Sequence, residues 1–262
     1  MPARERGKVV ACTSGVTSPV SEWRPHVAAS PRGMCGSDGG DAPGMDTRQV
    51  AGCCDPRGCQ EMFGEGFARR MAKRYRRRGL DAAAGRLADF LARDGLDGST
   101  VLEVGGGVGE IGLELLRRGA ASVTNVELST AYDLEARRLA EQLGVADRVQ
   151  RRIVDVAAAP DAVGPADLVV LHRVVCCYPD YERLLGAAAD LCRSRLAFSH
   201  PPRDLGIRAV VATQNALFAL WGKEFRTFAH PPEAMVAVVA SRGLKPVYAH
   251  PGWIWHVEGL AR

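Results

Sequence analysis

The stretch that decides the fold reads Val101-Leu102-Glu103-Val104-Gly105-Gly106-Gly107-Val108-Gly109. Its first four residues predict a short strand, and its glycines predict a tight turn. The apolar positions that follow, from Ile111 to Leu116, predict a helix after the turn. A strand that feeds a helix through glycines places backbone N–H groups at the carboxyl edge of a sheet, where they hold an anion or approach a nucleoside.

The sequence after residue 98 alternates strands with helices. Strands are predicted over 101–104, 122–127, 149–155, 167–172, 195–199, 244–249 and 253–257. Helices are predicted over 131–143, 181–192, 207–220 and 232–241. Several of the strands are apolar on both faces, which is typical of a doubly wound parallel sheet. Only Pro251-Gly252 and a few neighbouring residues separate the last two strands. A link this short allows only antiparallel pairing of the two strands. We therefore predict an α/β fold with a mostly parallel, seven-stranded, Rossmann-like sheet and an antiparallel last strand.

Composition divides the chain into three parts. Residues 1–50 are rich in Gly, Pro, Ser and Thr and cannot bury enough apolar surface to offset their ordering entropy, which predicts a disordered tail. Residues 51–97 form a cysteine-containing segment and a helical cap, in which Phe63, Phe67, Met71 and Tyr75 recur every four residues. Gly79 is expected to end this helix, and a second should begin at Asp81. Residues 98–262 are expected to form the α/β domain that contains the glycine turn and binds the cofactor.

The bulk properties indicate a globular protein with a full core. The chain has 262 residues, 47% of them hydrophobic, and no apolar run long enough to span a bilayer. No signal-peptide stretch is visible, so we expect a cytoplasmic protein with reduced cysteines and no membrane partner. The formal charge of +4 is concentrated in residues 69–78. This run could bind an acidic substrate or RNA, but a solvated helix face is favoured, and a nucleic-acid partner is not expected.

Glu103 decides which cofactor suits the turn, with support from Asp155, whereas Glu127 alone does not discriminate because dehydrogenases use the same acid. The overlapping pattern Gly107-Val108-Gly109-Glu110-Ile111-Gly112 would also suit a dinucleotide, but alone it is weak. Glu103 would repel a pyrophosphate, whereas a cationic amino-acid group would offset its cost in a buried strand. Glu127 ends the next strand, where a carboxylate can accept both ribose hydroxyls. Asp155 ends the third, placed to accept from an adenine amino group, with Val156 beside the ring.

Together these residues resemble the class I S-adenosylmethionine-dependent methyltransferase family over about residues 98–260. The residues that match its motifs are Glu103, Gly105, Gly107 and Gly109 for the first motif, Glu127 for the ribose and Asp155 for adenine. The resemblance implies S-adenosylmethionine as the cofactor and methyl transfer as the reaction.

In that family the methyl acceptor lies beyond the fourth strand, here residues 171–180. The Asp/Asn-Pro-Pro-aromatic pattern of nucleobase methyltransferases is missing there. The segment looks more like the small-molecule O-methyltransferases, such as the Mg-protoporphyrin and ubiquinone-pathway enzymes, so a small-molecule acceptor and O-methylation are favoured. A hydroxyl or thiol acceptor needs a base, and the candidates are His172, His200 and Tyr178. A carboxylate acceptor would need none, and all three would then be structural.

The cysteines leave a further question open. Cys53, Cys54 and Cys59 precede the first helix, and Cys176-Cys177 lies at the presumed acceptor position. If they converge, they would make a soft site for zinc, an iron–sulfur cluster or a metalloid. Adjacent cysteines do not easily hold one ion, and no C-x-x-C pair is present, so no metal ligand is assigned.

Two alternative functions remain at this stage. One is an NAD(P)-dependent oxidoreductase, through the overlapping glycine pattern. The other is a thiol-metal binding module built on a methyltransferase scaffold.

Overall fold

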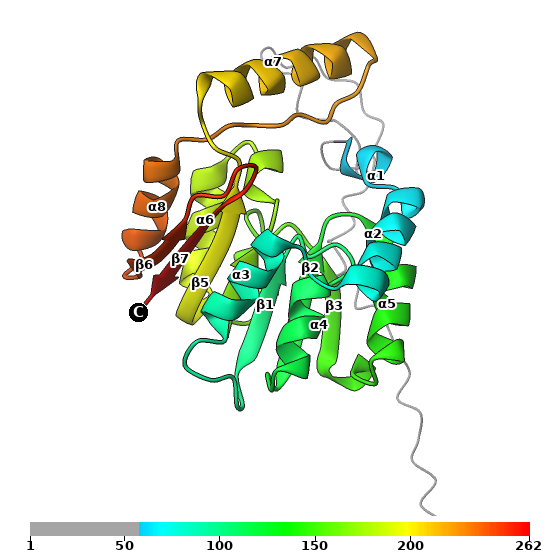
Figure 1. Cartoon of the computed structure of the whole chain (residues 1–262), viewed down its shortest axis with the longest axis vertical. Helices are drawn as coiled ribbons and strands as arrows, with labels where there is room; N and C mark the ends of the chain where they lie inside the picture. Colours follow the sequence, from blue (N-terminus) through cyan, green and yellow to red (C-terminus); the bar gives the residue numbers. More distant parts are fainter. Residues whose placement is uncertain (1–57) are drawn as a thin grey trace, which may run out of the picture.

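The computed structural model describes residues 58–262. The tail predicted over residues 1–50, together with Cys53 and Cys54, lies outside them. The strands are β1 Thr100–Val104, β2 Ser122–Glu127, β3 Val149–Ile153, β4 Ala166–Leu171, β5 Cys192–His200, β6 Lys245–His250 and β7 His256–Ala261. The α-helices are α1 Cys59–Met62, α2 Glu65–Arg78, α3 Ala82–Leu91, α4 Glu110–Arg117, α5 Asp133–Gln142, α6 Tyr181–Asp190, α7 Leu205–Leu220 and α8 Pro232–Ala240. The predicted strand–glycine–helix unit is thus confirmed as β1, the turn and α4 (Figure 1).

Within the described residues the strands form one seven-stranded sheet in the order β3-β2-β1-β4-β5-β7-β6. Strands β1 to β5 run parallel, and β7 pairs antiparallel with both β5 and β6. The predicted fold class is confirmed. The strand order reverses between β1 and β4, and in doubly wound sheets ligands bind at the carboxyl ends of the strands at such a point.

The final strand lies later in the chain than predicted. We expected it over 253–257, but β7 begins at His256. Trp253 and Ile254 are exposed in the connection between β6 and β7. Their apolar character resembles a strand in the sequence, yet the register with β5 buries Val257 and Leu260 instead.

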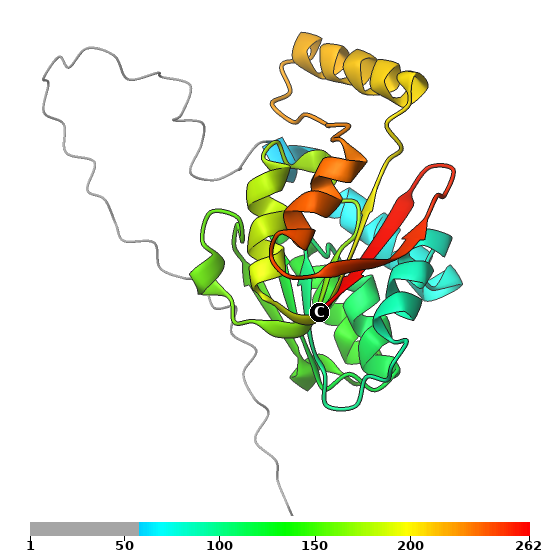
Figure 2. The same ribbon diagram turned by 90° about the vertical axis from the view of Figure 1, so that its left-hand side faces the viewer.

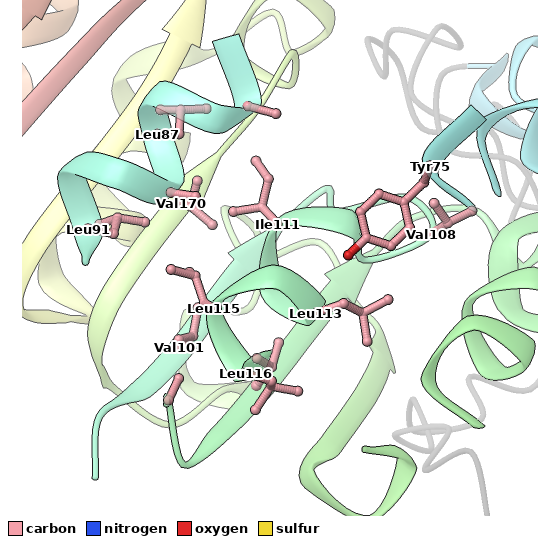
Figure 3. Packing of buried hydrophobic residues seen from close by; sticks show 14 of the residues in the cluster. Tyr75, Leu87, Leu91, Val101, Val108, Ile111, Leu113, Leu115, Leu116 and Val170 are labelled. Atoms are coloured by element: carbon pink, nitrogen blue, oxygen red, sulfur yellow. The ribbon is translucent and has the colours of Figure 1, made fainter. Parts of the chain in front are cut away.

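Apolar side chains on the two faces of the sheet form separate cores. The adjacent residues Val101 and Leu102 contribute to opposite cores, as the alternation of a strand requires. Helices α2, α3, α4 and α5 cover the Val101 face, where Ile111, Leu115 and Val170 pack closely (Figure 3). Helices α6 and α8 cover the Leu102 face. Burial on both faces explains the apolar strands and fixes the carboxyl edge of the sheet in place.

The helical cap begins with two helices rather than one. α1 ends at Met62, and α2 begins after Gly64. Gly79 (φ 67°) ends α2, and α3 begins directly after Asp81, as the sequence predicted. The Asp81 side chain caps α3 by accepting the N–H groups of Ala83 and Ala84.

The basic run of α2 is only partly a solvated face. Arg77 and Arg78 are exposed. Arg74, in contrast, binds both carboxylate oxygens of Glu110 on α4 at 2.7 and 2.8 Å. The cap is therefore fastened by charge to the helix that follows the glycine turn.

The insert between β5 and β6 contains α7, which stands off from the sheet (Figure 2). None of the residues of α7 is buried. Among the described helices, none combines the length and apolar character that crossing a bilayer requires.

Candidate functional site

A cavity of about 460 Å³ opens at the carboxyl edge of the sheet, at the point where the strand order reverses. Its floor comes from the glycine turn and from the ends of β1 and β2. Its sides come from the segments that follow β3 and β4, and its roof from α1 and α2. This volume is in the range of pockets that bury small organic molecules.

The glycine turn needs glycine at specific positions. Gly105, Gly107 and Gly109 have φ values of 61°, 56° and 83°, a left-handed conformation that other residues rarely adopt. A Cβ atom on Gly105 would lie 2.5 Å from Cγ2 of Val174, in the segment after β4. The turn thus brings the backbone of β1 against the presumed acceptor segment. Gly105 and Gly107 line the cavity, and Gly109 is the residue from which α4 begins.

Glu103 lies behind the turn and is 3% exposed. Its carboxylate accepts the N–H groups of Ile111 and Gly112, at 3.3 and 3.2 Å, and the side-chain amide of Asn125 at 3.1 Å. Burial raises the pKa of Glu103 to about 7, although the hydrogen bonds from Asn125 and Gly112 lower it. Glu103 also lines the cavity, so a cation bound there would favour its charged form.

Asn125 and Arg151 support the turn, and sequence reasoning missed both. One guanidinium nitrogen of Arg151 donates to the carbonyl oxygen of Gly107 and to Oδ1 of Asn125, each at 2.7 Å. Asn125 in turn donates to Glu103. A polar and a charged residue on the buried strands β2 and β3 were the available signal, because such groups are costly without partners.

Two further carboxylates lie along the same edge. Glu127 accepts the N–H of Gly107 at 2.9 Å on one oxygen and that of Leu128 at 2.8 Å on the other. Asp155 accepts the N–H of Ala157 at 3.1 Å. Glu127, Asp155 and Val156 all line the cavity, and their roles in cofactor binding stay a prediction. A carboxylate has about four acceptor positions, and the N–H groups of Gly107, Leu128 and Ser129 occupy three of them at Glu127.

Aromatic and sulfur-containing side chains form the roof. Phe63, in the link between α1 and α2, and Phe67 and Met71, in α2, line the cavity. The rings of Phe63 and Phe67 meet edge to face at 5.4 Å. A Cβ on Gly107 would lie 3.6 Å from Cε of Met71, so the cap lies directly over the glycine turn. Tyr75, the next residue in this four-residue pattern, packs in the core instead.

His172 is the candidate base that faces the cavity most directly. It follows β4, lines the cavity and has a side chain that is 10% exposed. Its Nδ1 lies 2.9 Å from Oγ of Ser199. Its Nε2 has no hydrogen-bond partner and lies 3.9 Å from Oδ2 of Asp81. The ring is held at Nδ1, while Nε2 is buried beside Asp81.

Asp81 connects the cap to the segment after β4, a connection that sequence reasoning missed. Oδ2 of Asp81 binds Arg173 at 2.6 Å and Arg74 at 3.0 Å. Burial alone would raise the pKa of Asp81, but His172, the Ala84 N–H and Arg173 hold this pKa well below its usual range. Arg173 is the one non-glycine residue among 58–262 with a positive φ, 60°. The contact with Asp81 stabilises Arg173 in that strained conformation.

Donor atoms of Asp81, Glu110 and His172 also lie within 4.8 Å of one another, which is close enough to consider a metal ion. Arg74 already binds both carboxylates, and Arg173 binds Asp81. The negative charge is balanced by guanidinium groups, so we interpret this cluster as an ion-pair network.

The other two candidate bases are placed less favourably. Tyr178 lines the cavity, but its hydroxyl donates to the carboxylate of Asp155, 3.0 Å from each oxygen, at the presumed adenine end. His200 is 1% exposed and does not line the cavity. Its Nδ1 lies 2.9 Å from the carbonyl oxygen of Pro201. The geometry therefore favours His172, and a role for Tyr178 or His200 as the base stays a prediction.

Comparison with known proteins agrees with this geometry. Residues 101–195 match the family described as "Methyltransferase domain". The matched region begins at β1 and ends within β5, so it contains the glycine turn and the three acids. No curated protein sequence matches the chain.

Several solved structures share the fold. Magnesium protoporphyrin IX methyltransferase from Synechocystis PCC 6803, solved with bound SAH, is 20% identical, with a TM-score of 0.61 over 78% of this chain and 97% of that chain. An O-methyltransferase family protein from Burkholderia thailandensis is 17% identical, with a TM-score of 0.60 over 79% of this chain and 61% of that one. An O-methyltransferase family 2 protein from Planctomyces limnophilus, in complex with apigenin, is 24% identical, with a TM-score of 0.57 over 74% and 61%.

Proposed function

The chain carries a methyltransferase domain of the class I S-adenosylmethionine-dependent type, and from this premise we propose that it methylates a hydroxyl group of a small, largely apolar molecule. The single observation that carries the proposal is the cavity, in which the glycine turn and three acids lie opposite an apolar roof, with His172 in its lining.

The charges of the site fit S-adenosylmethionine better than a dinucleotide. The cofactor offers a cationic amino group and a sulfonium, and it supplies an electrophilic methyl group when bound. Glu103 and Glu127 flank the glycine turn, where the pyrophosphate of NAD would meet two carboxylates. We assign Glu103 to the amino-acid end, Glu127 to the ribose, and Asp155 with Val156 to adenine. These assignments disfavour the oxidoreductase alternative.

The acceptor half of the cavity combines apolar walls with one base. Phe63, Phe67 and Val174 contribute apolar surface, which suits the body of an apolar acceptor. His172 suits a hydroxyl, because this acceptor must lose a proton as its oxygen attacks the methyl carbon. The bound structures of similar proteins include apigenin and geranyl diphosphate, both small organic molecules, which supports a small-molecule acceptor but does not select a hydroxyl.

The reaction then balances as follows. The hydroxyl oxygen forms a bond to the methyl carbon while the bond between that carbon and the sulfonium sulfur breaks. The hydroxyl proton passes to the imidazole of His172, and S-adenosylhomocysteine and the methyl ether are released. Ser199 holds Nδ1, and the Asp81 carboxylate stabilises the imidazolium that forms.

Labelled S-adenosylmethionine tests this proposal directly. The full chain is incubated with methyl-labelled cofactor and acceptors of matched size that carry a phenolic hydroxyl, a carboxylate, a thiol or an amine. We expect label in the phenolic products, and we expect His172→Gln to lose that activity while His250→Gln, on β6 and outside the cavity, retains it. Transfer to carboxylates or amines alone, with His172→Gln fully active, would refute the assignment of hydroxyl acceptors.

A further inference from the structure

The exposed apolar side chains of the described residues are concentrated at one end of the molecule. Seven of the ten large apolar residues that are exposed lie in α7, directly after it, or in the connection between β6 and β7. They are Leu205, Val210, Leu217, Leu220, Trp221, Trp253 and Ile254, and we call them the apolar surface. Both segments follow the carboxyl edge of the sheet, at the same end as the cavity (Figure 1, Figure 2). Such a concentration marks an interaction site.

Helix α7 presents an apolar face outward. Its inward face is held by the segment that follows the helix, since the side-chain amide of Asn215 donates to the carbonyl oxygen of Thr227 at 2.8 Å and accepts the Thr227 N–H at 2.9 Å. The opposite face consists of exposed residues without charge: Leu205, Ala209, Thr213, Ala216 and Leu220. Leu205 and Leu220 are 79% and 80% exposed. A surface helix ordinarily turns charged side chains outward, so this face indicates an apolar partner.

Two tryptophans lie at the tips of the apolar surface. Trp221 follows α7 directly, and Trp253, 96% exposed, lies with Ile254 in the connection between β6 and β7. Tryptophan is enriched at the boundary between lipid and water, where an apolar ring and a polar N–H are both accommodated. Apolar tips on two separate elements can enter a fluid bilayer without the shape complementarity that a protein interface requires. These features favour a bilayer over a second copy of the chain.

The charges beside α7 suit an anionic bilayer. Arg203, Arg208 and Arg226 flank or belong to α7, and none of the three forms an ion pair with a carboxylate among the described residues. Arg203 and Arg226 donate instead to the backbone carbonyl oxygens of Ala229 and Phe225. Anionic lipid headgroups would supply the negative charge that these guanidinium groups do not find in the protein.

Aromatic side chains connect α7 to the cavity. Phe63, which lines the cavity, meets Phe225 edge to face at 5.2 Å. The ring of Phe225 lies 6.0 Å from that of Phe218 in α7. The apolar roof of the cavity is therefore continuous with the helix that carries most of the apolar surface.

We propose that α7 and the connection between β6 and β7 dock on the surface of a bilayer that contains anionic lipids. The sequence predicted no membrane partner because no run is long enough to span a bilayer, but a helix that lies in the plane of the interface needs no such length. Docking would bring the cavity next to the phase in which an apolar acceptor dissolves, a consequence that rests on the proposed function.

Sedimentation with sucrose-loaded vesicles tests the docking. The full chain is mixed with vesicles of phosphatidylcholine and phosphatidylglycerol in equal parts, or of phosphatidylcholine alone. We expect binding to the mixed vesicles that weakens at high salt, and weaker binding to the neutral vesicles. Leu220→Asp and Trp253→Asp should each reduce binding to the mixed vesicles by about tenfold or more, because each removes an apolar anchor and adds a negative charge.

The matched control is Leu134→Asp, because Leu134 is an exposed apolar residue of α5, outside the apolar surface. It should bind vesicles as the unchanged chain does, and circular dichroism should show all three variants folded. The proposal is overturned if the unchanged chain binds neither kind of vesicle, or if Leu220→Asp and Trp253→Asp both bind the mixed vesicles as the unchanged chain does.

Light scattering without vesicles tests the other occupant of this face. If the unchanged chain is a dimer that Leu220→Asp converts to monomers, α7 joins two copies of the chain and the bilayer proposal is rejected. Titration with S-adenosylhomocysteine in the same samples separates the docking from the proposed function. Cofactor affinity should be equal in all variants, and vesicle binding without cofactor binding would reject the proposed function alone.

Discussion

The clearest consequence of the buried carboxylate of Glu103 is a pH-dependent affinity for the cofactor. Burial raises the pKa of Glu103 from 4.5 to about 7 in the protein without ligand. This group stabilises the fold fully below pH 4.5, and that contribution is lost as the pH rises through 7. A cationic amino group in the cavity would favour the charged carboxylate and restore the stability that ionisation costs.

The size of the change in affinity follows from the pKa shift of Glu103. A displacement from 4.5 to about 7 corresponds to about 3 kcal/mol between the two protonation states. If the ligand returns the pKa of Glu103 toward its ordinary value, affinity gains up to about tenfold per pH unit, or about 40-fold between pH 5 and pH 7. Glu103→Gln carries no charge at either pH. Its affinity should be flat, near that of the unchanged protein at pH 5 and about 40-fold weaker at pH 7.

Isothermal titration with S-adenosylhomocysteine at pH 5, 6 and 7 measures this directly. At pH 6 the unchanged protein should also release a proton on binding, which appears as a dependence of the heat on the ionisation enthalpy of the buffer. Circular dichroism confirms that Glu103→Gln is folded. If the affinity of the unchanged protein does not depend on pH, or if the affinity of Glu103→Gln depends on pH equally, the carboxylate of Glu103 does not interact with the bound ligand.

Three other substitutions test separate parts of the site. Gly105→Ala should lower the free energy of unfolding by about 1–3 kcal/mol and weaken cofactor binding, because the new Cβ would lie 2.5 Å from Cγ2 of Val174. A denaturant titration that finds unchanged stability would contradict this. His172→Gln should reduce kcat by about 10²–10⁴-fold with unchanged affinity for S-adenosylhomocysteine, and undiminished turnover would exclude His172 as the base. Asp81→Asn should cost about 1–3 kcal/mol of stability, because Arg173 loses its charged partner, and should lower kcat more than it changes KM. A melting temperature and a kcat equal to those of the unchanged chain would count against a role for the contact between Asp81 and Arg173.

The sequence was sufficient to predict the sheet and the cofactor edge, because both depend on local patterns. A strand ending in glycines leads into a helix wherever it occurs, and parallel strands bring their carboxyl ends to one edge. Glu103, Glu127 and Asp155 each follow or end such a strand, so their meeting at one cavity follows from the topology.

The parts that escaped prediction depend on contacts between residues distant in the chain. Asp81 and Arg173 are 92 residues apart, and no local pattern indicates that the cap returns to the segment after β4. Arg151 reaches the glycine turn from β3 in the same way. At Trp253 the local pattern was misleading. The apolar residues there resembled a strand in the sequence, but the strand that pairs with β5 begins after them, and Trp253 is exposed.

The positions of Cys176 and Cys177 also lay beyond the sequence, because the 3₁₀ helix after β4 sets the separation of their Sγ atoms, which is 3.7 Å.

The most direct test of the central claim is a titration of the full chain with S-adenosylhomocysteine and, in parallel, with NADH. The account predicts saturable binding of one S-adenosylhomocysteine per chain and no measurable heat from NADH. Tight binding of NADH, with no heat from S-adenosylhomocysteine, would contradict it.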